Sequence, residues 1–201
     1  LTGQIPTELG NLEELQSIDF SNNQFSGEIP ESLFSLTNLT FLSLGTNQLN
    51  GNIPTRIGDL SLLYYLDLSS NNLTGQISYE IGNLTNLYFL YLSNNLLSGL
   101  IPESICNLDW NYSMINNNQL CPPYPECIES FVGYQDTSEC TECPDSIEGD
   151  TNYDGYVNIL DIVLVGNCIL LDNCDECSDL NYDDSVDVLD IVIMITIVLE
   201  L

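Results

Sequence analysis

Apolar residues over about positions 1–120 follow a pattern that recurs with one fixed period. The segments that begin at residues 1, 25, 49, 73 and 97 share an opening of the form L/F-x-G-x-I-P, with Ser78 once in place of the proline. Within each repeat, an alternation such as Leu42-Ser43-Leu44 predicts a short β-strand with one buried face. Such a fixed period predicts a solenoid in which each repeat packs against its neighbours.

Three further positions recur with the predicted strands: a glycine, an isoleucine and an asparagine. They are Gly3, Gly27, Gly51, Gly75 and Gly99; Ile5, Ile29, Ile53, Ile77 and Ile101; and Asn23, Asn47, Asn71, Asn95 and Asn118. The period and the lettering resemble leucine-rich repeats, and the G-x-I-P segment resembles the plant-type subclass, over about residues 1–120. The resemblance implies a leucine-rich-repeat solenoid of short parallel β-strands with an irregular convex side. It also implies a ladder of buried asparagines that bond the backbone of neighbouring turns, because a buried amide must be paired.

The repeat pattern degenerates after residue 108, and the cysteines of the chain begin nearby, at Cys106. We therefore expect five repeats over residues 1–119, a cysteine-rich cap over 120–143 and a separate domain over 144–201. The last turn of a solenoid needs an atypical repeat to close its core. The cap is expected to be stapled by Cys106, Cys121, Cys127 and Cys140, and three pairings remain open.

Aromatic residues flank the buried strand leucines and should point to the concave side. The candidate binding surface consists of Phe41, Tyr64, Tyr65, Tyr88, Phe89 and Tyr91. So many exposed rings on one sheet favour a contact patch for a protein or a sugar. The alternative interpretation is local stabilisation of the sheet by neighbouring aromatic pairs.

Two acidic segments near the carboxyl end, beginning at Asp150 and Asp179, repeat each other. Each places oxygen-bearing groups at positions 1, 3, 5, 7, 9 and 12, which is the ligand spacing of an EF-hand calcium loop. The first set is Asp150, Asn152, Asp154, Tyr156 through its carbonyl, Asn158 and Asp161, and the second is Asp179, Asn181, Asp183, Ser185, Asp187 and Asp190. The spacing predicts two calcium ions, whose removal should unfold the segment.

Each acidic loop ends in aspartate and leads into an apolar segment, 158–170 or 187–199. The pair resembles a dockerin module over about residues 148–199. The resemblance implies a small α-helical calcium domain that attaches a secreted protein to a cohesin partner. Asp184 stands where the second loop should carry a glycine, and the apolar pairs Ile159-Leu160 and Val188-Leu189 depart from small polar recognition residues. The calcium prediction carries over, whereas the partner's identity does not.

The remaining cysteines surround this module: Cys143, Cys168, Cys174 and Cys177. Two C-x-x-C pairs raise the possibility of zinc. Disulfides are favoured, because the stretch between the two pairs, 144–173, is long for a zinc site and contains a whole calcium loop.

The charge balance excludes several classes of function. The 201 residues include 30 acids, one cation (Arg56) and no histidine, giving a net charge of −29. Such a chain repels nucleic acid and anionic membranes, and it lacks the groups used in most acid–base catalysis near neutral pH. We therefore expect no enzyme. We also expect no membrane insertion, because the longest apolar run, 191–199, is too short to span a bilayer. The sequons Asn38, Asn72, Asn83 and Asn111 are candidate glycosylation sites.

Eight cysteines indicate an oxidising compartment, so we expect an extracellular or cell-surface protein. Three functions remain open. The first is calcium-dependent adhesion, with head-to-tail assembly into filaments: residue 1 opens inside a repeat and should expose Leu9, Leu12 and Leu15, and the apolar helix at 191–199 needs burial. The alternative is ligand or glycan recognition by the repeats, with the dockerin-like module anchored to a cohesin partner. The third is regulation of cell-wall hydrolases, as in some plant-type repeat proteins.

Overall fold

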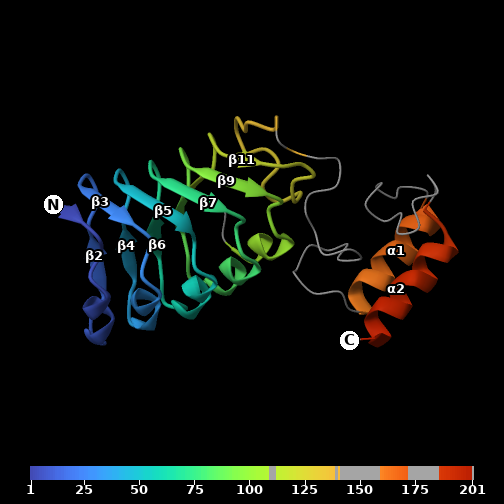
Figure 1. The fold of residues 1–201 in the computed structure, drawn as a ribbon, viewed down its shortest axis with the longest axis horizontal. Coiled ribbons are helices and arrows are strands. Elements are labelled where there is room, and N and C mark those ends of the chain that lie inside the picture. The colour runs from blue at the N-terminus through green and yellow to red at the C-terminus, as the bar shows by residue number, and fades with distance from the viewer. Residues whose placement is uncertain (109–111, 139, 141–158, 172–185, 201) are drawn as a thin grey trace. The chain divides into compact units, whose positions relative to one another are not determined.

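The computed structural model describes residues 1–108, 112–138, 140, 159–171 and 186–200. The chain divides into two compact units, Leu1–Glu139 and Cys140–Leu201. The first unit is the repeat solenoid and the second contains two α-helices (Figure 1). The predicted boundaries at 119 and 143 stay predictions.

One sheet of the solenoid is built from the predicted strands. Its five parallel strands lie in the order β10-β8-β6-β4-β2, so each repeat contributes one strand beside the next. They are β2 (Ser17–Asp19), β4 (Phe41–Ser43), β6 (Tyr65–Asp67), β8 (Phe89–Tyr91) and β10 (Tyr112–Met114). The register is that of the repeat, because Phe41 pairs with Tyr65 and Tyr65 pairs with Phe89. We call the outer side of this sheet the strand face.

The rest of each repeat, which was expected to be irregular, is instead regular. A second parallel sheet has six strands: β1 (Thr2–Gly3), β3 (Gln24–Gly27), β5 (Gln48–Asn52), β7 (Asn72–Gly75), β9 (Leu96–Gly99) and β11 (Gln119–Leu120). The repeat glycines of these strands adopt positive φ, 75° at Gly51, which turns the chain out of the sheet. Five 3-10 helices complete the turns: η1 (Thr7–Asn11), η2 (Glu31–Ser35), η3 (Thr55–Asp59), η4 (Tyr79–Asn83) and η5 (Glu103–Asn107).

Each 3-10 helix begins where proline, or Ser78 in the fourth repeat, ends the extended segment. Proline suits the position because it fixes φ and needs no hydrogen-bond acceptor. The hydroxyl oxygen of Ser78 is buried without a partner, so the exchange leaves a polar atom unsatisfied. The solenoid's cation, Arg56, lies in η3 and pairs with Asp59 at 2.9 Å.

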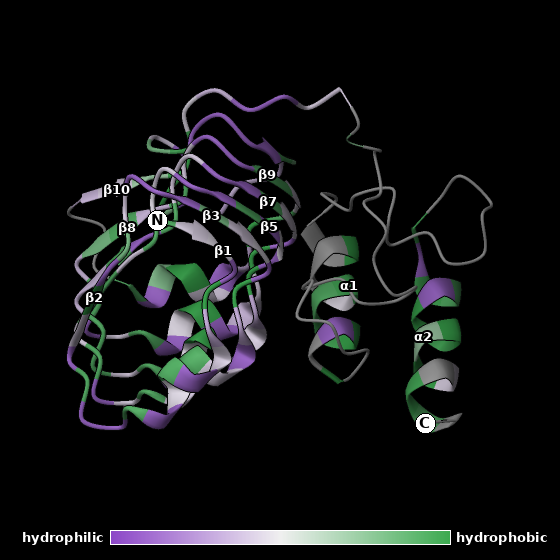
Figure 2. Cartoon of the chain, turned by 60° about the vertical axis from the view of Figure 1, so that its left-hand side comes forward, coloured by the Kyte–Doolittle hydropathy of each residue, from purple (hydrophilic) through white to green (hydrophobic). Residues whose placement is uncertain are grey.

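The solenoid core lies between the two sheets and the 3-10 helices, as the view in Figure 2 indicates. The inward-facing leucines of the strands, such as Leu42, Leu66 and Leu90, and the isoleucine column that follows the glycines are buried. Phe34 fills the core from η2 and is also fully buried. The alternation read from the sequence therefore places the core residues correctly.

The asparagine ladder expected from the sequence is confirmed from Asn47 onward, whereas the half-buried Asn23 donates only to carbonyls of its own turn. The side-chain oxygen of Asn71 accepts a hydrogen bond from the backbone N–H of Leu49 (3.0 Å), and its nitrogen donates to the carbonyls of Leu44 (3.1 Å) and Leu68 (3.2 Å). The equivalent bonds are made by Asn47, Asn95 and Asn118. The amides thus join successive turns inside a core that excludes water.

The cap continues the ladder with a different residue. Gln135 accepts a hydrogen bond from the backbone N–H of Leu120 (3.3 Å) and donates to the carbonyls of Ile115 (3.0 Å) and Val132 (2.9 Å). A disulfide joins Cys106 in η5 to Cys127, one of the pairings that the sequence left open. Cys121 and Cys140 are disulfide-bonded as well.

In the second unit, α1 (Ile159–Leu171) packs against α2 (Val188–Glu200). Residues that follow the two predicted loop starts at the same distance have the same burial in the two helices. Val165 and Met194 are both buried, and Val163 and Val192 are both exposed. No helix among the described residues is long and apolar enough to cross a membrane.

Candidate binding surface

The aromatic residues predicted from the sequence lie together on the strand face. Phe41 and Tyr65 stack with ring centroids 4.4 Å apart, and Tyr65 contacts Phe89 at 5.7 Å. A neighbouring row holds Tyr64 and Tyr88, stacked at 5.4 Å. Tyr91 contacts both Tyr65 and Phe89. Together with Tyr112, these six residues form one connected group, which we call the aromatic strip.

Tyr112 is the member that the sequence analysis missed. Its strand is paired in register with β8, and its ring contacts Phe89 (5.3 Å) and Tyr88 (5.6 Å). It is 55% exposed, more than Tyr64 at 49%. The fifth repeat is one position shorter than the others, so a strict period overlooks Tyr112. Asn118 could have revealed Tyr112, because aligning the fifth repeat on this ladder asparagine places Tyr112 opposite Phe89.

Neighbouring rings cover one another's faces within the strip. The interplanar angle is 11° for Phe41 and Tyr65 and 7° for Tyr64 and Tyr88. Stacked rings leave mainly their edges for a ligand, and aromatic edges are electropositive whereas the faces are electron-rich. A sugar ring packs on an exposed aromatic face, so this arrangement suits a peptide better than a glycan.

The strand face becomes acidic toward the first repeats. Strand register places Asp19 and Asp67 on either side of Ser43, roughly 10 Å apart at the usual strand spacing. Hydrogen bonds from the Ser21 hydroxyl (2.7 Å) and backbone N–H (3.0 Å) lower the pKa of Asp19. Asp67 accepts equivalent bonds from Ser69. Both carboxylates are therefore held as hydrogen-bonded acceptors beside the aromatic strip.

The phenol of Tyr65 stands between the aromatic and acidic regions. Partial burial is the main cause that raises its pKa, and the charges of Asp67 and Asp19 and the neighbouring Tyr91 add to the effect. Tyr65 therefore remains a neutral hydrogen-bond donor near neutral pH.

Most of the predicted calcium ligands lie outside the described residues. Asp161, Asp187 and Asp190 are the members that can be placed. Asp161 and Asp190 occupy the first turns of α1 and α2 and are both 0% exposed. The carboxylate of Asp190 accepts the backbone N–H of Asp187 (2.8 Å), and that of Asp187 accepts the N–H of Leu189 (2.7 Å). The Asp187 side chain thus caps the first turn of α2, and the Asp190 carboxylate bonds back to the capping residue, which gives Asp190 a structural role besides any metal.

The described residues contain no cluster of three acidic, histidine or cysteine side chains suited to a metal. The remaining predicted ligands, with Cys143, Cys174 and Cys177, lie outside the described residues, and Cys168 lies in α1. Of the sequons, Asn72 and Asn83 are exposed or half-exposed, whereas the Asn38 amide donates to the carbonyl of Glu13 (2.9 Å). Asn111 lies outside the described residues.

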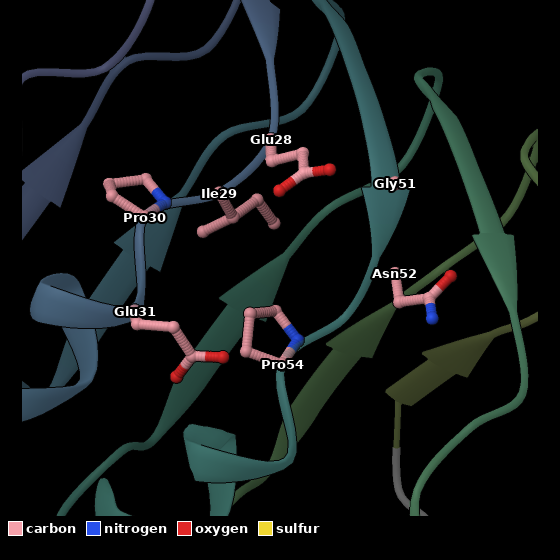
Figure 3. Close-up of a pocket in the computed structure, with 7 residues that line it drawn as sticks. All are labelled: Glu28, Ile29, Pro30, Glu31, Gly51, Asn52 and Pro54. Carbon is pink, nitrogen blue, oxygen red and sulfur yellow. The ribbon is translucent and has the colours of Figure 1, made fainter.

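A separate hollow of about 330 Å³ lies where the second sheet meets the 3-10 helices. Figure 3 shows Glu28, Glu31 and Asn52 around it, with Pro30 and Pro54 between them. Its carboxylates attract cations in general, but the hollow holds no group that would select a ligand.

Comparison with known proteins relates the solenoid to plant proteins. A family profile described as "Leucine-rich repeat region" matches residues 2–109. The Arabidopsis receptor kinase HAESA, solved with the peptide hormone IDA and the co-receptor SERK1, is 38% identical with a TM-score of 0.64, over 67% of this chain and 23% of that chain. The LRR ectodomain of the receptor kinase SOBIR1 from Arabidopsis thaliana is 39% identical with a TM-score of 0.55, over 61% and 68%.

A plant ice-binding protein is 38% identical with a TM-score of 0.57, over 60% of this chain and 39% of that chain. No curated protein matches significantly. The chain spans about a quarter of HAESA and two fifths of the ice-binding protein.

Proposed function

The chain belongs to the leucine-rich repeat family over residues 2–109, and on that premise we propose that it is an extracellular, non-enzymatic recognition protein whose aromatic strip binds a peptide segment. The observation that carries this proposal is the group of seven contacting rings on registered strands, two of them about half exposed. Large rigid rings supply contact area at low entropic cost, which is why they dominate binding sites. The structure solved with a peptide hormone, HAESA, agrees with this class of ligand.

The chemistry around the strip narrows the ligand further. Asp19 and Asp67 border the rings, and the whole chain carries one Lys or Arg against 30 acids. Complementary charge raises association rates and excludes wrong partners. The ligand should therefore be a peptide with apolar or aromatic residues over Phe89 and Tyr112 and a cationic residue toward Asp67.

A displayed random-peptide library selected on the immobilised protein tests this proposal. We expect enrichment of basic, aromatic-containing peptides whose binding is lost in Phe41→Ser with Phe89→Ser. Tyr79→Ser is the control, since Tyr79 is an exposed aromatic residue that lies in η4, outside the strip. Selected peptides that bind the double variant as well as the wild type would rule out the strip as the site.

We further propose that residues 144–201 form a dockerin-like calcium module that anchors the solenoid to a cohesin-like partner. The buried Asp161 and Asp190, which end the two repeated acidic segments, fit the last ligands of two calcium loops, because a buried carboxylate needs a cation or hydrogen-bond donors. The helices also leave apolar side chains exposed for a partner: Ile159, Val163, Leu164, Val188, Leu189, Val192, Ile195 and Leu199.

Calorimetric titration of the calcium-free protein with calcium tests whether the acidic loops bind the ion or whether Asp190 only caps its helix. Two ions are expected per chain, with Asp154→Ala and Asp183→Ala each removing one and Asp136→Ala, in the solenoid, removing none. Absence of calcium binding in the wild type would leave Asp190 with its capping role alone. Head-to-tail assembly into filaments stays a prediction: of the leucines expected to be exposed in the first repeat, Leu12 is exposed, whereas Leu9 and Leu15 are partly buried against the solenoid core.

A second candidate function rests on the second sheet. None of its six strands contains a charged residue, although the chain has 30 acids. Exposed Asn50, Asn72 and Thr74 form part of a regular neutral array, with adjacent strands about 4.8 Å apart. A regular array of neutral groups suits binding to a crystalline surface whose atoms also repeat at regular intervals. We suggest ice as that surface, because one of the similar structures is a plant ice-binding protein.

Ice recrystallisation in the presence of the purified protein tests the second candidate. Inhibition by the wild type that is lost in Asn50→Lys with Thr74→Lys, but kept in Phe41→Ser with Phe89→Ser, would support it. Unchanged ice growth with the wild type would contradict it.

A further inference from the structure

Tyrosines from three successive repeats touch one another along the aromatic strip. Tyr88 contacts Tyr64 with ring centroids 5.4 Å apart and an interplanar angle of 7°, and it contacts Tyr112 at 5.6 Å and 45°. Tyr64 and Tyr112 are each about half exposed. The proximity is imposed by the backbone, because the N–H groups of Tyr88 and Phe89 both donate to the carbonyl of Tyr64 (3.0 and 3.2 Å). We infer that Tyr64 and Tyr88 form a site of oxidative tyrosine cross-linking, which would covalently join two neighbouring repeats.

The reaction requires a one-electron oxidant, such as a peroxidase supplied with hydrogen peroxide. Each phenol loses one electron to the oxidant and its hydroxyl proton to water, which leaves two tyrosyl radicals. The radicals combine through a carbon–carbon bond between ring positions ortho to the oxygens, and the two ortho hydrogens then move to the oxygens. Overall, the tyrosines lose two electrons and two protons, and one hydrogen peroxide takes up both to become two waters.

The pair Tyr64–Tyr88 is favoured over the other aromatic contacts. Phe41 and Phe89 lack the hydroxyl that radical formation needs, which removes the stacks containing phenylalanine. The rings of Tyr88 and Tyr112 are less parallel, at 45°, and those of Tyr65 and Tyr91 are tilted by 58°. Burial and nearby carboxylates raise the pKa of Tyr65, so loss of its proton is disfavoured.

Cross-linking here does not depend on the ligand proposed for the strip. A bond between Tyr64 and Tyr88 closes a loop one repeat long and so restricts the unfolded chain. It also fixes two rings whose movement would otherwise allow the strip to adapt to a ligand.

Photo-oxidation of the full chain in calcium with tris-bipyridyl ruthenium and persulfate, a two-electron acceptor, tests the inference. We expect dityrosine fluorescence in protein that remains monomeric on denaturing gels. Digestion with a glutamate-specific protease should release a peptide pair joined through Tyr64 and Tyr88 with the loss of two hydrogen atoms. Tyr88→Phe, which keeps the ring, should lose most of the fluorescence, whereas Tyr79→Phe, in η4 and about as exposed as Tyr64 (50% against 49%), should keep it.

Dityrosine that appears only in covalent dimers, or that persists in Tyr88→Phe, would overturn the inference. A cross-link mapped to Tyr88 and Tyr112, or to Tyr65 and Tyr91, would overturn it as well. None of these results depends on peptide binding, so the inference and the proposed function fail separately.

Discussion

At the scale of single residues, the ladder amides carry the polar groups of an otherwise apolar core. Asn71 satisfies three backbone groups from two repeats at once. An unpaired buried donor or acceptor costs about 1–3 kcal/mol, whereas a satisfied one is nearly neutral. A single asparagine side chain therefore supplies the hydrogen-bond partners that several buried peptide groups would otherwise lack.

We expect Asn71→Ala to lower the free energy of unfolding by roughly 2–5 kcal/mol, because it removes four side-chain hydrogen bonds and leaves buried peptide groups unpaired. Urea unfolding of the solenoid measures the change. Asn50→Ala is the matched control, since Asn50 is exposed in β5, and it should change stability by no more than about 0.5 kcal/mol. Equal effects of the two substitutions would contradict the role of the ladder.

The serine beside Asp19 gives a prediction about protonation. Ser21→Ala removes the hydroxyl hydrogen bond that contributes most to the lowered pKa of Asp19, so that pKa should rise toward the ordinary aspartate value. A lowered folded-state pKa contributes stability above the unfolded pKa, and this stability is lost as the pH falls through the folded pKa. The variant should therefore lose stability relative to the wild type near neutral pH and converge with it in acid. NMR titration of the Asp19 carboxyl carbon measures the shift directly.

At the scale of elements, the stack of 3-10 helices depends on residue size at one repeat position. Gly10, Gly58 and Gly82 occupy it in three repeats, and Phe34 occupies it in η2. A methyl group on Gly58 would come within 2.7 Å of the Glu80 carbonyl oxygen in the next helix. The glycines thus allow neighbouring helices to approach closely. In the second repeat, the same position holds the buried ring of Phe34.

Glycine-to-alanine substitutions in two elements should have opposite effects. Gly58→Ala should destabilise the solenoid by about 1–3 kcal/mol, because the obstructing atom belongs to the backbone. In α1, the nearest atom to a new methyl at Gly166 is 3.9 Å away, so Gly166→Ala should stabilise its unit by about 0.4–1 kcal/mol. Urea unfolding of each unit measures both changes. Destabilisation by Gly166→Ala would show that α1 needs glycine for another reason.

The pattern of the repeats predicted the strands, the buried columns and the ladder, because each rests on local alternation repeated five times. It did not predict the second sheet, whose strands exist only through hydrogen bonds to neighbouring turns. Gln135 was also missed, since the cap forms the ladder bonds with a longer side chain outside the period. The six aromatic residues lie on one face as expected, but five of them are half-buried and Tyr64 alone is exposed, and their role in binding stays a prediction. Tyr112 required the shortened fifth repeat to be aligned.

At the scale of the whole molecule, the two units hold their cores by different means. The solenoid core is continuous through its repeats, whereas the apolar cluster between α1 and α2 centres on Val165 and Met194. A small helical pair is rarely stable without a metal or disulfides. The second unit is therefore the part expected to depend on ions.

Chelation of calcium should unfold residues 144–201 and leave the unfolding transition of the solenoid in place. Circular dichroism at the helical minimum follows the first, and urea unfolding follows the second. The double change Asp150→Ala with Asp179→Ala should reproduce the effect of the chelator in calcium. Equal loss of structure in both parts would contradict the two-unit division.

The position of Arg56, paired with Asp59 in η3, affects how readily proteases can cleave the protein. Trypsin-like enzymes cut after lysine or arginine, and Arg56 is the single such residue in the chain. It lies within η3, and a protease must bind its target as an extended strand, so cleavage requires the third repeat to open locally. A solenoid built in this way keeps its single site for trypsin-like enzymes folded until the third repeat opens.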